Sequence, residues 1–362
     1  MKSRIYLDHA ATTPVCGAAR QAVMAALDTL GNPSSVHAGG RAANGIVENA
    51  RDVIAEWANV RSESIIFTSG GTEALALALG GLDAKRVVVS AVEHSAVLAA
   101  RPDAIVLPVD GNGLVDIGEL ARLVAQGVDL VAVQAANNET GVIQYAVGAA
   151  EVANLAGVLS LQDSVQSAAY WGGAGTGEDF TAVSAHKLGG PQGVGCLIAR
   201  DLDRLKAVQR GGGQERGLRG GTPNLPGIAG FAAAVAAGPF DWAKVEALRN
   251  RLEDQLTAAW PALVIHGKLA DRMAHISSIG LPGVSAQTQV MALDLAGFMV
   301  SAGAACSSGK VRESHVLRAM GLGAAAGEAI RVSLGPNTTE AEIDAFAEAW
   351  LAMAARLSRR AA

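Results

Sequence analysis

The chain has 362 residues and a formal net charge of −5 at pH 7, with half of its residues hydrophobic and 4% aromatic. This charge argues against a nucleic-acid-binding protein, because such proteins gather Lys and Arg on one face. No apolar run approaches the ~18 to 20 residues of a membrane span, so we expect no membrane-spanning segment.

We expect no secretory signal at the beginning of the chain, because Asp8 interrupts residues 1–8 before any apolar stretch forms. We therefore expect a cytoplasmic protein. Its three cysteines, Cys16, Cys196 and Cys306, are too few and too scattered for a disulfide framework or a metal cluster. A cytoplasmic location would keep these thiols reduced.

Strand-like runs alternate with helical patterns between about residues 41 and 235, a rhythm typical of a mainly parallel sheet. A helical stripe of apolar residues over 41–57 fits a helix that covers such a sheet. The predicted strands are 65–68, 87–90, 105–109, 130–134, 158–161, 182–184 and 195–199.

A second, smaller α+β region is predicted after Asp241. It opens with a helix, continues with short strands near 262–265 and 275–279, and closes with a helix over 340–357. We thus predict an α/β fold with a large domain of residues 14–237. Residues 1–13 and 238–362 would form the small domain.

Lys187 and Asp163 offer an amine and a carboxylate at two predicted strand ends. Lys187 follows the apolar run 180–183, and Asp163 closes the run 158–161. A lysine can form a Schiff base with the aldehyde of pyridoxal phosphate, and an aspartate can keep its pyridine nitrogen protonated. Two solvated loop charges are the alternative interpretation of this pair.

Other predicted strands also end in polar groups. Gly71 and Thr72 stand where a strand, a glycine turn and a helix meet, an arrangement that binds phosphate or serves only as a turn. The spacing is that of neither a dinucleotide-binding motif nor a Walker motif.

His94 follows another strand and can stack on a ring, relay protons or be a plain loop histidine. Asn138 follows a further strand, so one crevice fed by successive strands is indicated.

Two more residues are candidates for chemistry. Cys306 lies in a run of small residues and is either an accessible nucleophile or inert, whereas Cys196 lies inside an apolar strand and reads as core. Arg331 places a guanidinium inside an apolar strand, which is costly unless it meets an anion. A substrate carboxylate and an internal Asp or Glu are both open as its partner.

Together these segments resemble the cysteine desulfurases, the NifS/IscS-like pyridoxal-phosphate enzymes of the class V aminotransferase family, from Tyr6 to about Phe346. The blocks that carry the resemblance are 6–14, 31–37, 211–216 and 219–222. It implies the fold-type I of pyridoxal-phosphate transferases and a homodimer with shared sites.

The resemblance also implies roles for individual residues. Lys187 would carry the cofactor, Asp163 would pair with the pyridine nitrogen, and His94 would stack on the ring. Arg331 would hold the substrate carboxylate, Asn138 would also contact the substrate, and Cys306 would be the nucleophile. The remaining cofactor contacts would be Asn138 and Gln166 to the ring substituents, Gly71, Thr72, Ser184 and His186 to the phosphate, and Thr222 to the phosphate of the neighbouring subunit.

The implied reaction converts L-cysteine to L-alanine and leaves a persulfide on Cys306 for a sulfur-acceptor protein, an iron–sulfur scaffold being one candidate. Another enzyme of the same family, such as an aminotransferase or a selenocysteine lyase, would share everything except the need for Cys306. A non-catalytic relic of the fold is a third reading, which the intact Lys187 and Asp163 disfavour. The resemblance implies no metal.

Overall fold

The computed structural model describes residues 4–171, 177–238, 240–303 and 313–361. Its largest sheet contains seven strands, β2 (Ile65–Thr68), β3 (Val87–Ser90), β4 (Ile105–Leu107), β5 (Leu130–Ala132), β6 (Leu159–Asp163), β7 (Phe180–Ser184) and β8 (Gly195–Ala199). Their order is β2-β8-β7-β6-β5-β3-β4. All neighbours are parallel except β8, which is antiparallel to both β2 and β7. The predicted mainly parallel sheet is confirmed.

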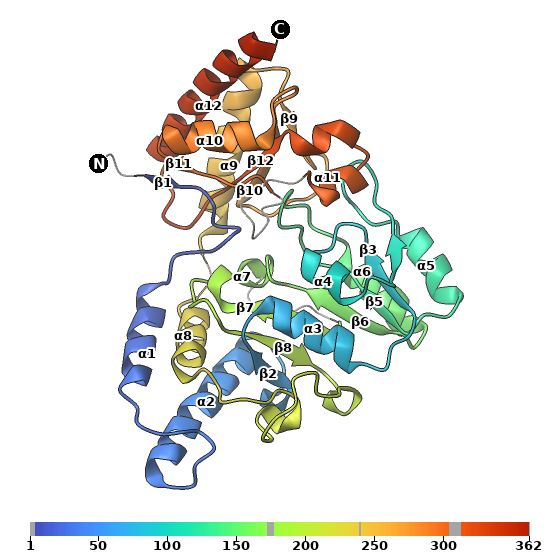
Figure 1. Cartoon of the computed structure of the whole chain (residues 1–362), viewed down its shortest axis with the longest axis vertical. Coiled ribbons are helices and arrows are strands. Elements are labelled where there is room, and N and C mark those ends of the chain that lie inside the picture. Colours follow the sequence, from blue (N-terminus) through green and yellow to red (C-terminus); the bar gives the residue numbers. More distant parts are fainter. Residues whose placement is uncertain (1–3, 172–176, 239, 304–312, 362) are drawn as a thin grey trace.

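Helices cover both faces of this sheet (Figure 1). One face packs on α3 (Gly71–Gly81) and α4 (Ser95–Ala100). The other packs on α2 (Ala38–Trp57) and α8 (Leu225–Ala236) over one half, and on α5 (Ile117–Ala125) and α6 (Ala146–Leu155) over the other half. Helix α1 (Gly17–Leu27) lies against α8, and α7 (Ala168–Trp171) follows β6. Successive side chains of β2 point to opposite faces of the sheet, so that Ile65 and Phe67 face α2 whereas Ile66 faces α3. This alternation explains why helices pack on both faces.

Two smaller sheets lie at the other end of the molecule (Figure 1). One pairs β1 (Ile5–Tyr6) with β11 (Phe298–Met299), and the other has the order β12-β10-β9. The other strands and helices of this part of the chain are β9 (Val264–Ile265), β10 (Ile276–Gly280), β12 (Ala329–Ser333), α9 (Trp242–Ala259), α10 (Ala286–Leu295), α11 (His315–Ala319) and α12 (Glu340–Ala361). Trp350 and Phe346 of α12 are fully buried in their shared core. The division of the chain into domains at residues 14 and 237 stays a prediction.

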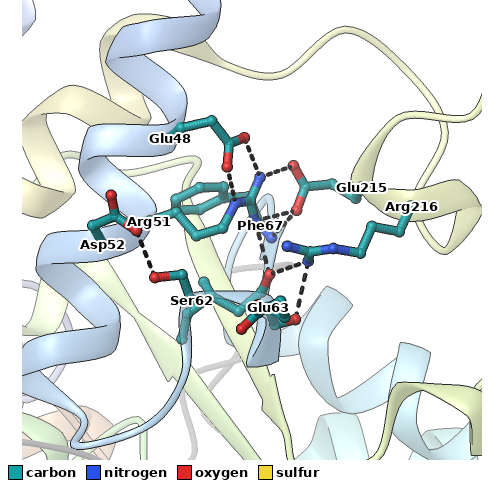
Figure 2. Close-up of polar contacts among 9 residues, drawn as sticks. Glu48, Arg51, Asp52, Ser62, Glu63, Phe67, Glu215 and Arg216 are labelled. Carbon is teal, nitrogen blue, oxygen red and sulfur yellow. Dashed lines mark hydrogen bonds and ion pairs between the residues drawn. The ribbon is translucent and has the colours of Figure 1, made fainter.

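A buried ion pair ties α2 to the segment after residue 209 (Figure 2). Arg51 and Glu215 form two hydrogen bonds of 2.9 Å each, and both side chains are 4% exposed. The guanidinium also donates to the carbonyl of Ile65 and lies 4.8 Å from the ring centre of Phe67. Glu215 in turn accepts the backbone N–H of Phe67 at 2.8 Å. This network joins three distant segments of the chain around one charge pair.

Across the described ranges, none of the helices combines the length and the apolar character that a membrane crossing requires.

Candidate active site

A cavity of about 710 Å³ opens at the carboxyl ends of β2, β3, β5, β6 and β7. Segments from the smaller sheets, with Asp8, Ser301 and Arg331, close its other side. This is the place where ligands bind on open α/β sheets. Ten of the predicted site residues line it: Gly71, Thr72, His94, Asn138, Asp163, Gln166, Ser184, His186, Lys187 and Arg331.

Lys187 ends a single helical turn directly after β7. The tight turn is possible because Gly189 adopts φ +82°, a left-handed conformation that favours glycine. The Lys187 amine donates to the carbonyls of Ala10 and Ala11, the latter at 2.8 Å. The lysine is thereby fixed with its amine inside the cavity.

Burial, together with the positive charge of Arg331, lowers the pKa of Lys187 from 10.5 to about 8. Between these two values the folded chain binds fewer protons than the unfolded chain, so this group makes stability rise with pH across that window. The amine is therefore far more available as a nucleophile at neutral pH than an ordinary lysine.

We expect acetic anhydride to label Lys187 of cofactor-free protein with a half-maximal rate near pH 8. Free N-acetyl-lysine amide, treated in parallel, should reach half-maximal labelling near pH ~10.4. Mass spectrometry of the Lys187 peptide over a pH series measures this midpoint. A midpoint that coincides with that of the free compound would contradict the shift.

Asp163 and His94 lie on the same side of the cavity. Asp163 is 8% exposed, and burial raises its pKa although its Oδ1 accepts the N–H of Val165 at 2.9 Å. His94 exposes its ring to the open cavity, yet the protein around it still lowers its pKa by desolvation. Its Nδ1 accepts the N–H of Ala96 and caps α4, so the ring orientation is fixed. A neutral imidazole and a buried carboxyl group, whose ionised form a cationic partner would stabilise, therefore face one space.

The first turn of α3 lies at one end of the cavity. Gly70 precedes it with φ +151° and extended ψ, a conformation that only glycine adopts readily. A Cβ on Gly71 would come within 2.5 Å of Val165, so this position is also restricted to glycine. Thr72 is exposed in that turn, and Ser184 and His186 line the same cavity. Free N–H groups at a helix N-terminus and nearby hydroxyls are typical phosphate ligands.

Arg331 has protein partners in this structure. It donates to the Asp8 carboxylate at 2.7 Å and to the carbonyl of Asn138 at 2.9 Å. The internal ion pair, which the sequence left open, is therefore present. The Nε of Arg331 is buried and has no hydrogen-bond partner among the described residues, and the residue lines the cavity.

Two predicted site residues do not join the cavity within the described part of this chain. Thr222 is exposed and lines a separate pocket of about 70 Å³ beside Arg219 and Asn224. Cys306 lies outside the described residues. Cys196, which the sequence assigned to the core, is fully buried, and burial raises the pKa of its thiol.

Sequence reasoning gave no role to Glu93, which lies next to His94. Its Oε1 accepts the Ser90 hydroxyl at 2.6 Å and the N–H of Gln134 at 2.8 Å. Complete burial raises the pKa of Glu93 to about 8, so the carboxyl group is largely protonated at neutral pH. No pattern in the sequence predicts the raised pKa of Glu93, because it results from contacts between β3 and the segment after β5.

The residues present fit pyridoxal phosphate. Four independent features agree: a reactive lysine, a buried carboxyl group whose ionised form a cation would stabilise, a neutral imidazole and a glycine-lined helix N-terminus. They converge on a cavity large enough for such a cofactor together with an amino acid.

Comparisons with known proteins agree with this fit. The chain matches the family model of class-V aminotransferases over residues 5–346. It is 41% identical to a cysteine desulfurase of Cereibacter sphaeroides over 95% of this chain and 94% of that protein. An IscS-like cysteine desulfurase of Mycobacterium tuberculosis is 37% identical over 99% and 98% of the two chains. The solved structure of a NifS-like protein from Rickettsia africae superimposes with a TM-score of 0.88, at 32% identity, over 97% and 99% of the two chains. This chain therefore belongs to the class-V aminotransferase family of pyridoxal-phosphate enzymes.

Proposed function

We propose that the protein is a cysteine desulfurase, which converts L-cysteine to L-alanine and transfers the sulfur to Cys306. The observation that carries this proposal is the single cavity that joins Lys187, Asp163, His94 and Arg331. The relatives named as cysteine desulfurases support the choice of substrate.

The cofactor would be held by groups at three places in the cavity. Lys187 would bond its aldehyde, Asp163 would pair with the pyridine nitrogen, and the His94 ring would stack on the pyridine. Asn138 and Gln166 would contact the ring substituents. The phosphate would lie against Gly71, Thr72, Ser184 and His186.

Bound there, pyridoxal phosphate supplies an electron sink for the Cα of an amino acid. Arg331 would hold the substrate carboxylate, and the Lys187 amine would remove the Cα proton. The Cys306 thiolate would then attack the sulfur of the substrate. The C–S bond breaks as an S–S bond forms, so L-cysteine and one thiol give L-alanine and one persulfide without any other reactant.

A homodimer is part of this proposal. Thr222 is exposed and lies outside the cavity of its own chain, as expected for a residue that serves the phosphate of a neighbouring subunit. The α1–α2 region also exposes Met24, Leu27, Leu30 and Val36, with 60%, 61%, 92% and 89% of their surfaces accessible. A second copy of the chain would cover such an apolar surface.

The sulfur would leave the enzyme for an acceptor protein, and an iron–sulfur scaffold is the acceptor class that we propose. Such a transfer fits the cytoplasmic location that we expect for the chain.

The test is to supply the yellow holoenzyme with L-cysteine and a thiol reductant and to measure sulfide and alanine together. We expect equal amounts of both products from the parent enzyme and neither from Cys306→Ala, whose cofactor absorbance should be unchanged. Production of alanine by Cys306→Ala at the parent rate would mean that sulfur leaves without this thiol and would favour a selenocysteine lyase. A yellow parent enzyme that forms neither alanine nor sulfide would favour an aminotransferase.

A further inference from the structure

The side chain of Glu93 joins the carboxyl ends of two strands, β3 and β5. Its Oε1 accepts the hydroxyl of Ser90, the last residue of β3, at 2.6 Å. The same oxygen accepts the N–H of Gln134, just beyond β5, at 2.8 Å. Because β3 and β5 are neighbours in the sheet, one carboxyl oxygen links their ends directly.

Two side chains beyond β5 strengthen this link from the other direction. Gln134 Nε2 donates to the carbonyl of Val92, and Asn137 Nδ2 donates to the same carbonyl at 3.0 Å. Val92 therefore accepts hydrogen bonds through its backbone, whereas Glu93 accepts them through its side chain. Both residues just before His94 are thus held in place relative to β5.

A third element holds the backbone of Glu93. The Nε2 of His315, in α11, lies 2.9 Å from the carbonyl oxygen of Glu93, which can only accept a hydrogen bond. Within the described ranges, the His94 ring makes one hydrogen bond of its own, in which Nδ1 accepts the N–H of Ala96 at 3.1 Å. The place of this ring in the cavity therefore also depends on the residue that precedes it.

Burial separates Glu93 from the cofactor site itself. The residue is 1% exposed and is not among the described residues that line the cavity, so it can act there only through its neighbours. Burial, with a smaller contribution from the negative charge of Asp163, raises the pKa of Glu93 to about 8. At neutral pH the group is thus mostly an uncharged acid, which keeps its contacts without placing a second negative charge near Asp163.

We propose that Glu93 is a positioning residue, which fixes the His94 ring in the cavity by tying the end of β3 to β5 and α11. The proposal rests on the function proposed above in one respect, the stacking of His94 on the cofactor ring. Side chains that support a site in this way hold its geometry to within about 0.5 Å, although they touch neither cofactor nor substrate.

The test measures the circular dichroism of the visible cofactor band in the holoenzyme, divided by the amount of bound cofactor. Pyridoxal phosphate is achiral, so this signal arises from the asymmetric arrangement of protein groups around its ring. We expect Glu93→Ala to keep the cofactor absorbance but to lose at least about half of the dichroism, because a loosely held His94 ring samples several positions. Glu93→Gln keeps an acceptor oxygen for Ser90 and Gln134 and should retain the parent signal.

Asp129→Ala is the matched control, because Asp129 links the amino ends of the same two strands. Its Oδ2 accepts the N–H groups of Lys85 and Arg86 at 2.8 Å each, at the edge of the sheet opposite to the cavity. This variant loosens β3 and β5 without touching the residues around His94, so it should keep the parent signal.

Ser90→Ala removes one donor to Glu93 and should lower the dichroism by a smaller amount, which keeps the test decisive if Glu93→Ala does not fold. Parent-like signals in Ser90→Ala and in folded Glu93→Ala would overturn the proposal. An equal loss in Asp129→Ala would also overturn it, because a loosened sheet would then explain the effect. A loss in Glu93→Gln as large as that in Glu93→Ala would overturn it as well, since the acceptor oxygen would not be what matters.

This readout requires bound cofactor but no turnover. If the parent enzyme produced no alanine from L-cysteine, the proposed function would fail while the dichroism still decided the role of Glu93.

Discussion

Replacing Lys187 with alanine is expected to lower kcat for L-cysteine by at least about 10³-fold, since a positioned general base alone contributes roughly 10²- to 10⁴-fold. The same change removes the amine that bonds the cofactor, so the loss includes nucleophilic catalysis as well. The amine is suited to both tasks because burial holds its pKa near 8. Alanine formation under saturating L-cysteine measures the effect.

Lys187→Arg separates the chemistry of the amine from its positive charge. A guanidinium stays protonated at any working pH and cannot remove a proton, so this variant should be as inactive as Lys187→Ala. Added methylamine should restore part of the activity of Lys187→Ala by entering the space that the lysine left. Activity of Lys187→Arg close to that of the parent would show that Lys187 acts only through its charge.

Glu215→Ala is expected to cost about 3–5 kcal/mol in the free energy of unfolding, as is usual when one member of a buried ion pair is removed. Arg51 would be left 4% exposed without its bidentate partner, and the N–H of Phe67 would lose its acceptor. Urea denaturation of the holoenzyme, followed by circular dichroism, measures the loss.

The matched control is Glu48→Ala, which removes the other carboxylate partner of Arg51. The Glu48 side chain is 49% exposed, and exposed ion pairs contribute about 0–1 kcal/mol. The double variant Arg51→Met/Glu215→Leu should recover most of the stability lost in Glu215→Ala, because it leaves no uncompensated buried charge. An equal, small loss for Glu215→Ala and Glu48→Ala would mean that the buried pair does not stabilise the fold.

Sequence patterns predicted the parts of the site that depend on residues close together in the sequence. Lys187, Asp163 and His94 each follow an apolar run, and parallel strands bring such strand ends to one edge. The predicted strand bounds agree with the observed ones to within about two residues, which is the uncertainty of assigning an element's end. The single-turn helix at Lys187 was missed because no apolar period can define so short an element.

Contacts between distant segments could not be predicted in the same way. Asp8 and Arg331 are 323 positions apart, Arg51 and Glu215 are 164 apart, and Glu139 and Ser314 are 175 apart. The sequence showed that Arg331 needed an anion, but the physics of burial does not specify which carboxylate supplies it. Only the folded topology selects the partner.

The path of the first residues also limits when the site can form during synthesis. Asp8 and Ala10 line the cavity, yet β1 pairs with β11 and the N–H of Ala10 donates to Ser333, 323 positions later. The seven-stranded sheet is complete at Ala199 and can fold while the ribosome is still adding residues. The cavity wall cannot close until Ser333 has left the exit tunnel, so a nascent chain acquires its finished site long after its main sheet.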